Sequence, residues 1–330
     1  MNQPDWNPHV RNSSESHCWS VSYMKLILFV LTLPLYSNVT LADQPMVLLR
    51  GDRPTELAPH RLGNVYAPEV HRHGGKLWMW YGGQGEDGHD RIHLAESKDG
   101  KAWHKQGVVI DNGSANHVND PSVVRVSNLW WMFYTVAAKG EQDEIAAASS
   151  QDGKNWTLHG VVLGVGQGNT WDSRKVGRPA VIYDGGKFHM WYDGQASSVA
   201  VASGDELSRR VNSEGRAVGY AKSEDGLNWV RQVAPVFHHG AGAVQVAKHH
   251  QRYILVFESG RGTRWASSIN PFEWRDQGML LKLSGEASDA FGHVTPCLQV
   301  DGNTTKLYYG AAARQTWDGN SIAVATVVFP

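Results

Sequence analysis

The stretch VNDPSVVRVSNLWWMFY, residues 118–134, holds two short apolar runs on either side of a polar break at Ser127 and Asn128. β-branched and aromatic residues around such a break are typical of two strands joined by a turn. The pattern recurs, because a proline precedes a tyrosine by 13 positions four times, and Val244 precedes Phe257 by the same distance. The four pairs are Pro68 and Tyr81, Pro121 and Tyr134, Pro179 and Tyr192, and Pro296 and Tyr309. Five copies at one spacing predict a repeat architecture.

Each copy continues into a third apolar run and then a turn of the form Ser-x-Asp-Gly-x-x-Trp. The turn occupies residues 97–103, 150–156 and 223–229, and an altered version occupies residues 268–274. Asp-Gly favours a tight turn because glycine accepts positive φ. The tryptophan begins a fourth run, and successive copies lie 53, 58, 65 and 52 residues apart. Four strands per repeat at this period predict an all-β, five-bladed β-propeller with four antiparallel strands per blade.

The fifth copy is incomplete, because only one further run, residues 321–328, follows Tyr309. The segment PMVLL at residues 45–49 matches the fourth-strand runs of the other copies. We therefore predict that this segment closes the ring as the outer strand of the fifth blade. Such closure would cover strand edges that otherwise favour aggregation.

The N-terminus carries a signal-peptide pattern. Met24 and Lys25 precede a largely apolar run of ten residues, 26–35, and a small residue, Ala42, suits cleavage. The run is too short to span a bilayer. We expect residues 1–23 to be a mis-assigned start, about 24–42 to be the signal, and 43–330 to be a single domain. This predicts a periplasmic or secreted protein, with no membrane association after cleavage. Cys18 would be lost, leaving Cys297 as a buried filler.

Composition restricts the partners. The 31 basic and 32 acidic residues give a net charge of −1, which argues against nucleic acid or an anionic membrane. We expect a monomer. The paired histidines lack a third ligand at metal-binding spacing, so no protein-bound metal is predicted. The third copy has an insertion at residues 194–215 containing Arg209 and Arg210. It would either border a binding face or be an ordinary surface loop.

Two positions vary while the rest of the repeat stays regular. The residue before each repeat proline, or before Val244, defines the pre-proline positions: Ala67, Asp120, Arg178, Ala243 and Thr295. The residue after each repeat aromatic defines the post-aromatic positions: Gly82, Thr135, Asp193, Glu258 and Gly310. The inner strands of a propeller line its axis, and a purely structural position would repeat one side chain. We therefore predict an axial pocket holding Asp120, Arg178, Asp193, Glu258 and, from the approach to the fifth blade, His293.

These residue types suit glycoside hydrolysis, which needs one protonated carboxyl and one ionised carboxylate. Arg178 is expected to hold Asp120 ionised, while Glu258 follows an apolar run and is expected to stay protonated. Structural alternatives exist for each residue. Asp120 could cap a strand, Arg178 and Glu258 could form an ion pair, Asp193 could begin a loop, and His293 could be a packed histidine.

The segment NDPSV at residues 119–123, the aromatic second strands and the repeated turns resemble the five-bladed propeller glycoside hydrolases. These are the arabinanases, β-xylosidases, invertases and levansucrases of families 43, 32, 68 and their relatives. The resemblance covers residues 43–330 and implies carboxylates on the inner strands of the first three blades. Asp120 matches the second-blade Asp-Pro, which in family 43 orients the acid and tunes its pKa. Gly292 and His293 are similar to a Gly-His pair before a late inner strand.

The chain departs from that family at two places. Ala67 occupies the first-blade position of the usual catalytic aspartate, and Arg178 stands where a third-blade glutamate is normal. Asp193 and Glu258, or Asp172 from the loop before the third blade, would then replace the missing carboxylates. This predicts an exported hydrolase of an oligo- or polysaccharide that needs no cofactor, with Asp120, Glu258 and Asp193 catalytic and Arg178, His293 and Asp172 binding substrate. A calcium or sodium ion could occupy the axial channel, although no motif specifies one.

The alternative is a carbohydrate-binding propeller that has lost catalysis. The repeated turn also looks like the Asp-box of sialidases, but it is one residue shorter. A sialidase needs three converging arginines and normally six blades, and the predicted inner strands supply only Arg178.

Overall fold

The repeats fold into groups of four strands in the computed structural model, which describes residues 40–41, 43–137, 140, 142–202, 215–301, 304–316 and 318–329. The first blade contains β3 (Val65–His73), β4 (Lys76–Gln84), β5 (Asp90–Ser97) and β6 (His104–Ile110). The second contains β7 (His117–Val126), β8 (Leu129–Ala137), β9 (Glu144–Ser150) and β10 (Thr157–Leu163). The third contains β11 (Lys175–Asp184), β12 (Lys187–Gln195), β13 (Ala217–Ser223) and β14 (Trp229–Arg231).

The fourth blade contains β15 (Gln245–His249), β16 (Arg252–Phe257), β17 (Gly262–Ser268) and β18 (Arg275–Lys282). The fifth contains β19 (Gly292–Asp301), β20 (Thr304–Ala312) and β21 (Asn320–Val328), with β2 (Met46–Arg50) and the short β1 (Thr40–Leu41) both paired with β21. Pairing within each blade is antiparallel, and one parallel bridge joins Asp90 to His117. The predicted all-β class and four-stranded antiparallel sheets are thus confirmed.

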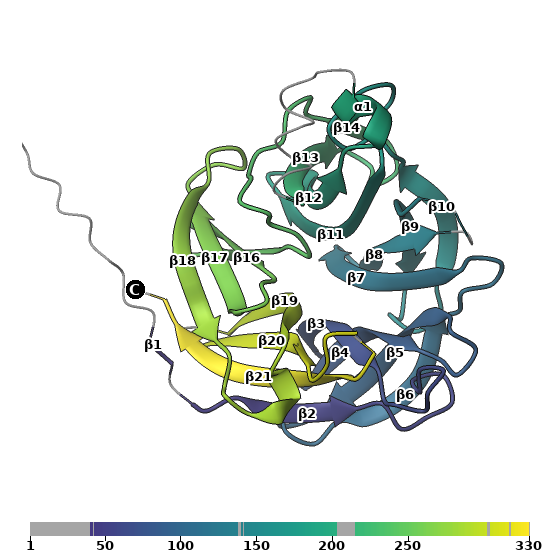
Figure 1. Ribbon diagram of the computed structural model, residues 1–330, viewed down its shortest axis with the longest axis vertical. Helices are drawn as coiled ribbons and strands as arrows, with labels where there is room; N and C mark the ends of the chain where they lie inside the picture. Colours follow the sequence, from purple (N-terminus) through teal and green to yellow (C-terminus); the bar gives the residue numbers. More distant parts are fainter. Residues whose placement is uncertain are drawn as a thin grey trace, which may run out of the picture. The chain divides into compact units, whose positions relative to one another are not determined.

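The first strand of each blade lies nearest the centre of the arrangement, as Figure 1 shows for β3, β7, β11 and β19. The last strands lie outermost, as β10 and β18 do. The described part of the chain also contains a short helix, α1 (Ser198–Ala202), and a 3₁₀ turn, η1 (Ala287–Asp289). Neither is long and apolar enough to cross a membrane.

The repeated turn forms as its sequence predicts. In the first blade, Ser97 Oγ accepts the amide of Gly100 at 2.8 Å, and Asp99 Oδ1 accepts the amide of Lys101 at 2.8 Å. The same bonds recur around Asp152 and Asp225. The following tryptophan closes the turn, since Trp229 Nε1 donates to the carbonyl of Gly226 at 3.0 Å. The turn aspartates are therefore structural.

The apolar core is divided among the interfaces between neighbouring blades. Trp80 of the first blade packs with Met132 of the second, and Phe133 of the second packs with Phe188 of the third. Further clusters join the third to the fourth blade and the fourth to the fifth. The last cluster joins the fifth blade to the first. Hydrophobic packing therefore joins each blade to its neighbours.

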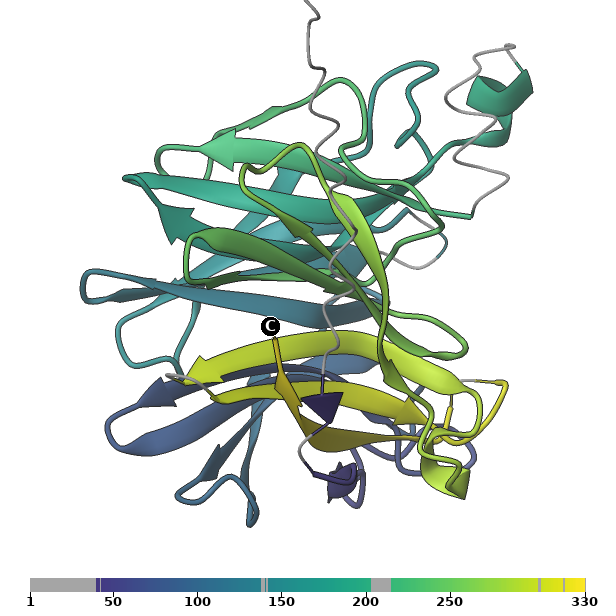
Figure 2. The same ribbon diagram turned by 90° about the vertical axis from the view of Figure 1, so that its left-hand side faces the viewer.

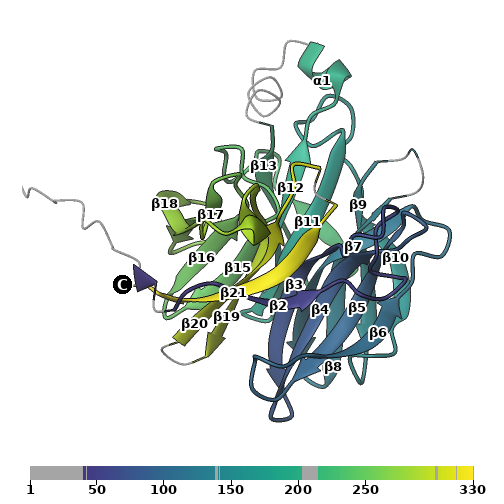
Figure 3. The same cartoon turned by 60° about the horizontal axis from the view of Figure 1, so that its bottom comes forward.

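Strand β2 lies along the outer side of β21, as Figures 2 and 3 show from two directions. Met46 pairs with Val324 and Arg50 pairs with Ser321. Leu49, 5% exposed, joins the cluster between the fifth and first blades. This end of the chain therefore contributes both backbone pairing and core packing.

Several predicted features lie outside the described residues. They are the leader at residues 1–42 apart from positions 40 and 41, with Cys18, and the Arg209–Arg210 pair of the insertion. The boundary at residue 43 stays a prediction. Cys297 is a buried free thiol, as predicted.

Leu49→Ala tests the contribution of β2. It should lower the free energy of unfolding by about 2–5 kcal/mol, because it leaves a cavity in a packed interface. Leu158→Ala on the outer strand β10, where the side chain is 58% exposed, is the matched control and should change it by less than about 0.5 kcal/mol. Equal midpoints for the two variants in denaturant titrations would show that packing of β2 contributes little to the free energy of unfolding.

Candidate functional site

The five pre-proline positions share one unusual backbone conformation. Their φ angles are all positive: 51° at Ala67, 51° at Asp120, 47° at Arg178, 48° at Ala243 and 43° at Thr295. Strand pairing skips a residue at four of them, for example between Asn119 and Ser122. Each of those is therefore a β-bulge, which turns one side chain out of the regular ladder. Proline suits the next residue because it has no N–H group that would need a partner.

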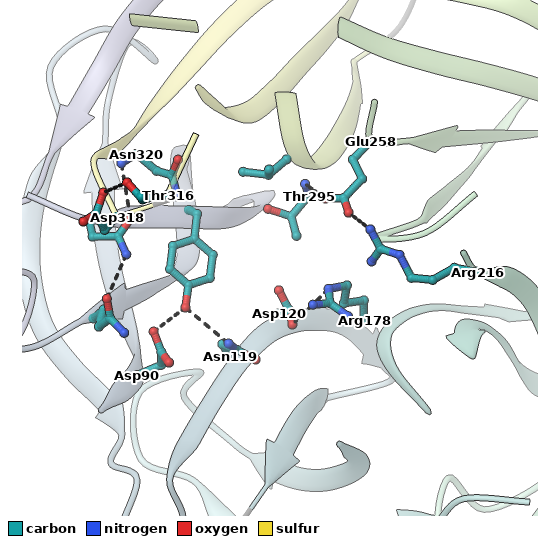
Figure 4. A pocket seen from close by; sticks show the side chains of 14 residues that line it. Asp90, Asn119, Asp120, Arg178, Arg216, Glu258, Thr295, Thr316, Asp318 and Asn320 are labelled. Carbon is teal, nitrogen blue, oxygen red and sulfur yellow. Dashed lines mark hydrogen bonds and ion pairs between the residues drawn. The ribbon is translucent and has the colours of Figure 1, made fainter. Parts of the chain in front are cut away.

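The bulges face a common space. All five pre-proline positions line one narrow axial cavity of about 20 Å³. Asp120, Arg178 and Thr295 also line a larger pocket of about 490 Å³ (Figure 4). The repeat pattern predicted this convergence on a central cavity.

The larger pocket is polar and has two chemically different ends. One end is charged and contains Asp120, Arg178, Arg216 and Glu258. The other end is rich in carboxamides and contains Asn64, Gln84, Asn119 and Asn320, together with Tyr66, Asp90, Thr316 and Asp318. Hydroxyl-rich ligands bind such a mixture of donors and acceptors by hydrogen bonds.

The charged end is an alternating chain of acids and arginines, which we call the charge chain. Arg178 Nε lies 3.9 Å from Asp120 Oδ2, and Arg178 Nη1 lies 3.4 Å from Asp193 Oδ2. Arg216 Nη1 donates to the same Asp193 oxygen at 2.7 Å. Arg216 Nη2 also donates to Glu258 Oε1. Five side chains from three blades are thereby linked through ion pairs.

Three post-aromatic side chains connect their own blade to the next one. Thr135 Oγ1 accepts the backbone N–H of Arg178 at 2.8 Å, and Asp193 Oδ2 accepts that of Ala243 at 3.1 Å. Glu258 Oε2 accepts the backbone N–H of Thr295 at 3.4 Å. Each acceptor therefore satisfies the amide of a pre-proline position in the following blade. Much of the variation at these positions has a structural cause.

The two glycines at post-aromatic positions are constrained by space. A Cβ on Gly310 would lie 2.5 Å from Val294 Cγ2, and one on Gly82 would lie 3.1 Å from the Tyr66 ring. The pre-proline amide of the first blade has a different kind of acceptor, because the N–H of Ala67 donates to the side chain of a pre-proline residue, Thr295 Oγ1, at 2.8 Å.

The two aspartates of the charge chain have opposite pKa shifts. Burial raises the pKa of Asp120 to about 6, although Arg178 opposes the change. Burial also acts on Asp193, but the attraction of Arg178 and Arg216 outweighs it and lowers the pKa of that carboxyl. Arg178 Nε, 3.9 Å from Asp120 Oδ2, therefore acts in the expected direction and lowers the pKa of Asp120, but burial has the larger effect.

The structure places three predicted site residues away from the pocket wall. His293 is fully buried, within hydrogen-bonding distance of Asp289 and Thr263, at 3.2 Å and 3.0 Å. Asp172 accepts Arg231 Nη1 at 2.7 Å and the Tyr192 hydroxyl at 3.0 Å. Asp193 is 0% exposed beneath the two arginines. Protein partners surround all three, so a substrate in the pocket would not touch them.

Sequence reasoning missed Arg216, Asp90 and Tyr66. Tyr66 donates its hydroxyl to Asp90 Oδ1 and accepts Asn119 Nδ2 at 3.2 Å. Burial raises the pKa of Asp90. A signal was available, because Asp90, Asp143 and Arg216 each stand seven residues before the serine of the repeated turn. Among the residues that the structure describes, no group of three or more His, Cys, Asp or Glu could hold a metal ion.

Comparison with known proteins relates part of the sequence to carbohydrate-active enzymes. The family described as glycosyl hydrolases family 32 N-terminal domain matches residues 51–173. An uncharacterised protein of Mycobacterium tuberculosis is 36% identical over 38% of this chain and 45% of its own length. A β-1,2-mannobiose phosphorylase of Thermoanaerobacter is 28% identical over 32% of this chain and 37% of its own. Each match thus spans less than half of that relative.

Solved structures match over most of the chain. A glycoside hydrolase superposes with a TM-score of 0.70 at 18% identity, over 87% of this chain and 92% of its own. A protein from work on GH130 mannoside phosphorylases and hydrolases superposes with a TM-score of 0.64 at 14% identity, over 89% and 95%. A family 117 glycoside hydrolase of Zobellia galactanivorans has a TM-score of 0.64 at 14% identity, over 89% and 90%. At these identities the likeness shows the fold.

The raised pKa of Asp120 predicts a pH-dependent stability difference. The unfolded chain releases this proton near pH 3.8, whereas the folded chain keeps it until about pH 6. The free energy of unfolding of the wild type therefore falls as pH rises from about 4 to 7. Asp120→Asn has no carboxyl to ionise at this position, so it should not lose this stability. The variant should be more stable than wild type by about 2–3 kcal/mol at pH 7, with the advantage shrinking towards pH 4.

Urea titrations at pH 4 and pH 7 measure the difference directly. Asp301→Asn, at an exposed ion pair with Arg72, is the control and should give no pH-dependent advantage. A constant difference between Asp120→Asn and wild type at both pH values would contradict the raised pKa.

Proposed function

Because the chain belongs to the superfamily of five-bladed propeller glycosidases, as a divergent member, we propose that it hydrolyses glycosidic bonds in an oligo- or polysaccharide. The observation that carries the proposal is Asp120, a carboxyl with a pKa of about 6 in the wall of a polar central pocket. Such a group is protonated enough near neutral pH to give its proton to a leaving oxygen.

Glu258 is the proposed base. Its Oε1 accepts a hydrogen bond from Arg216 Nη2, and the side chain lines the pocket. An ionised carboxylate can take a proton from an attacking water. In this proposal Asp120 is the acid and Glu258 the base, the reverse of the assignment expected from sequence. Asp193 supports this end of the pocket without touching the sugar.

Phosphorolysis is a second candidate. Arg178 and Arg216 both line the pocket, and guanidinium groups bind phosphate in bidentate fashion. Phosphate would then replace water as the nucleophile, and Asp120 alone would supply the proton. The named relatives include a β-1,2-mannobiose phosphorylase, to which part of the chain is similar.

A binding protein without catalysis is the remaining alternative, motivated by Ala67 and Arg178 at positions where the resembled enzymes carry acids. It predicts saturable binding of a glycan without products. The carboxamide end of the pocket would serve such a protein equally well.

We also propose that β2 closes the ring and that residues 24–42 direct export of a monomer. Pairing of β2 with β21 supports the first proposal. The charged start and apolar run support the second. Mass spectrometry of protein expressed from Met24 in a Gram-negative host should find a mature chain beginning at residue 43, and an uncleaved cytoplasmic product would contradict export.

Activity is tested by incubating the purified protein with a panel of oligosaccharides, with and without inorganic phosphate. Hydrolysis should release free reducing sugar at the same rate in both conditions, whereas phosphorolysis should give a sugar 1-phosphate only with phosphate. Asp120→Asn and Glu258→Gln should each lower kcat about 10²- to 10⁴-fold if hydrolysis is correct.

The two variants also separate the candidates. Loss of activity in Asp120→Asn alone, together with phosphate dependence, would replace hydrolysis by phosphorolysis. Binding by calorimetry without any product from the panel would favour the binding protein. Asp301→Asn serves as the control and should retain wild-type kcat.

A further inference from the structure

We propose that Asp193 is a positioning residue, whose buried carboxylate holds Arg178 away from the proton donor Asp120 and holds Arg216 on Glu258. The inference rests on the proposed function, because it assigns the electrostatic separation of the two carboxyls that act there. It gives Asp193 a role different from the catalytic one expected from sequence.

The contacts of Asp193 are concentrated on one oxygen. Oδ2 receives Arg216 Nη1 at 2.7 Å, the amide of Ala243 at 3.1 Å and Arg178 Nη1 at 3.4 Å. Oδ1 is buried with no hydrogen-bond partner among the described residues. The side chain is fully buried, so it cannot reach a bound sugar. It can act only through the groups it holds.

Arg178 is shared between two carboxylates. Its Nη1 lies 3.4 Å from Asp193, whereas its Nε lies 3.9 Å from Asp120, beyond hydrogen-bonding distance. A guanidinium that made a full bidentate bond with Asp120 would stabilise the ionised form of that carboxyl. Asp193 competes for the same guanidinium and leaves Asp120 able to keep its proton.

Arg216 is held in the same way on the other side. One nitrogen binds Asp193 and another binds Glu258, so the arginine bridges the two carboxylates. The amide of Ala243 fixes Asp193 against the fourth blade, from which Glu258 comes. Asp193 therefore sets the positions of both arginines relative to the acid and the base.

The charged groups around Asp120, Asp193 and Arg178 support the same role for Asp193. Arg178, Asp193 and Asp143 act on Asp120, and the Thr135 hydroxyl bonds to it. The pKa of Asp193 is affected by three cations: Arg178, Arg216 and Lys175. The pKa of Arg178 is affected by four carboxylates: Asp120, Asp193, Glu258 and Asp143. Removing the Asp193 charge would free Arg178 to approach Asp120 and would also remove a repulsion. Both changes favour ionised Asp120.

The test compares Asp193→Asn with Asp193→Glu, which keeps the charge, and with Asp172→Asn as a matched control. Asp172 is an equally buried carboxylate of the same part of the chain that binds Arg231 and Tyr192 and does not line the pocket. The alkaline limb of kcat/KM against pH should move down by about one pH unit or more in Asp193→Asn, since an opposite charge within hydrogen-bonding reach shifts a carboxyl pKa by that much. Asp193→Glu should restore part of the shift, and Asp172→Asn should show none.

A second readout does not need activity. Titration of ¹³C-labelled aspartate carboxyls by NMR, with the Asp120 signal assigned by its absence in Asp120→Asn, should give a lower pKa for Asp120 in Asp193→Asn than in wild type. If Asp193→Asn does not fold, the double variant Asp193→Asn, Arg216→Gln removes one charge of each sign and leaves Arg178 free in the same way. It should show the same lowered pKa.

The outcomes distinguish the role of Asp193 from the proposed function. An unchanged Asp120 titration in the Asn or double variant would overturn the role of Asp193, whatever the enzyme does. A lowered Asp120 pKa in a protein that cleaves no glycan would support the role of Asp193 and refute the proposed function. A shift of equal size in Asp172→Asn would show only a general effect of charge loss, which overturns the inference.

Discussion

The left-handed conformation of the pre-proline residue, within or just before the inner strand of each blade, is the constraint on which the site depends. A non-glycine residue in this conformation costs roughly 1–2 kcal/mol, and the chain adopts it at Ala67, Asp120, Arg178, Ala243 and Thr295. At four of these positions a bulge turns the side chain out of the strand ladder, and all five line the axial cavity. Without it, the alternation of a regular strand would place neighbouring side chains on the two faces of a blade, where other blades pack.

The bulge also creates a need for hydrogen-bond acceptors. A backbone N–H that leaves the ladder in a buried place must find another partner. Thr135, Asp193 and Glu258 supply acceptors to the following blade at the third, fourth and fifth pre-proline positions. Two of these acceptors carry a negative charge, and a buried charge requires a counter-charge. Arg178 and Arg216 provide it, so a requirement of the backbone leads to the charge chain.

The sequence was sufficient for the fold because the fold depends on local patterns. Strand alternation, the 13-residue spacing from Pro121 to Tyr134 and its copies, and the Asp-Gly turns each act within a few residues. The convergence of the pre-proline positions followed from the repeat. The raised pKa of Asp120 did not, because it depends on burial of the carboxyl in the folded protein and on a 3.9 Å distance to Arg178.

Other site residues were missed for similar reasons. Arg216 lies beyond the long insertion of the third blade, and no inner-strand pattern includes it. His293 and Asp172 occupy positions suggested by the resemblance or by chain order, yet neighbouring side chains take up their hydrogen-bonding groups. Chain order places a residue near an axis, but it does not say whether protein partners already occupy its polar atoms.

The absence of acids at Ala67 and Arg178 does not remove the asymmetry that acid–base chemistry needs. What such chemistry requires is two carboxyl groups whose surroundings favour opposite protonation states. Here the second blade contributes Asp120, whose pKa is raised by burial, and the fourth contributes Glu258, whose Oε1 accepts a hydrogen bond from Arg216. The arginine at the third pre-proline position is part of this separation, because Asp193 draws it away from Asp120. An arginine at a position where the resembled enzymes carry an acid would thus be, in this chain, one of the groups that keep the proposed acid and base different.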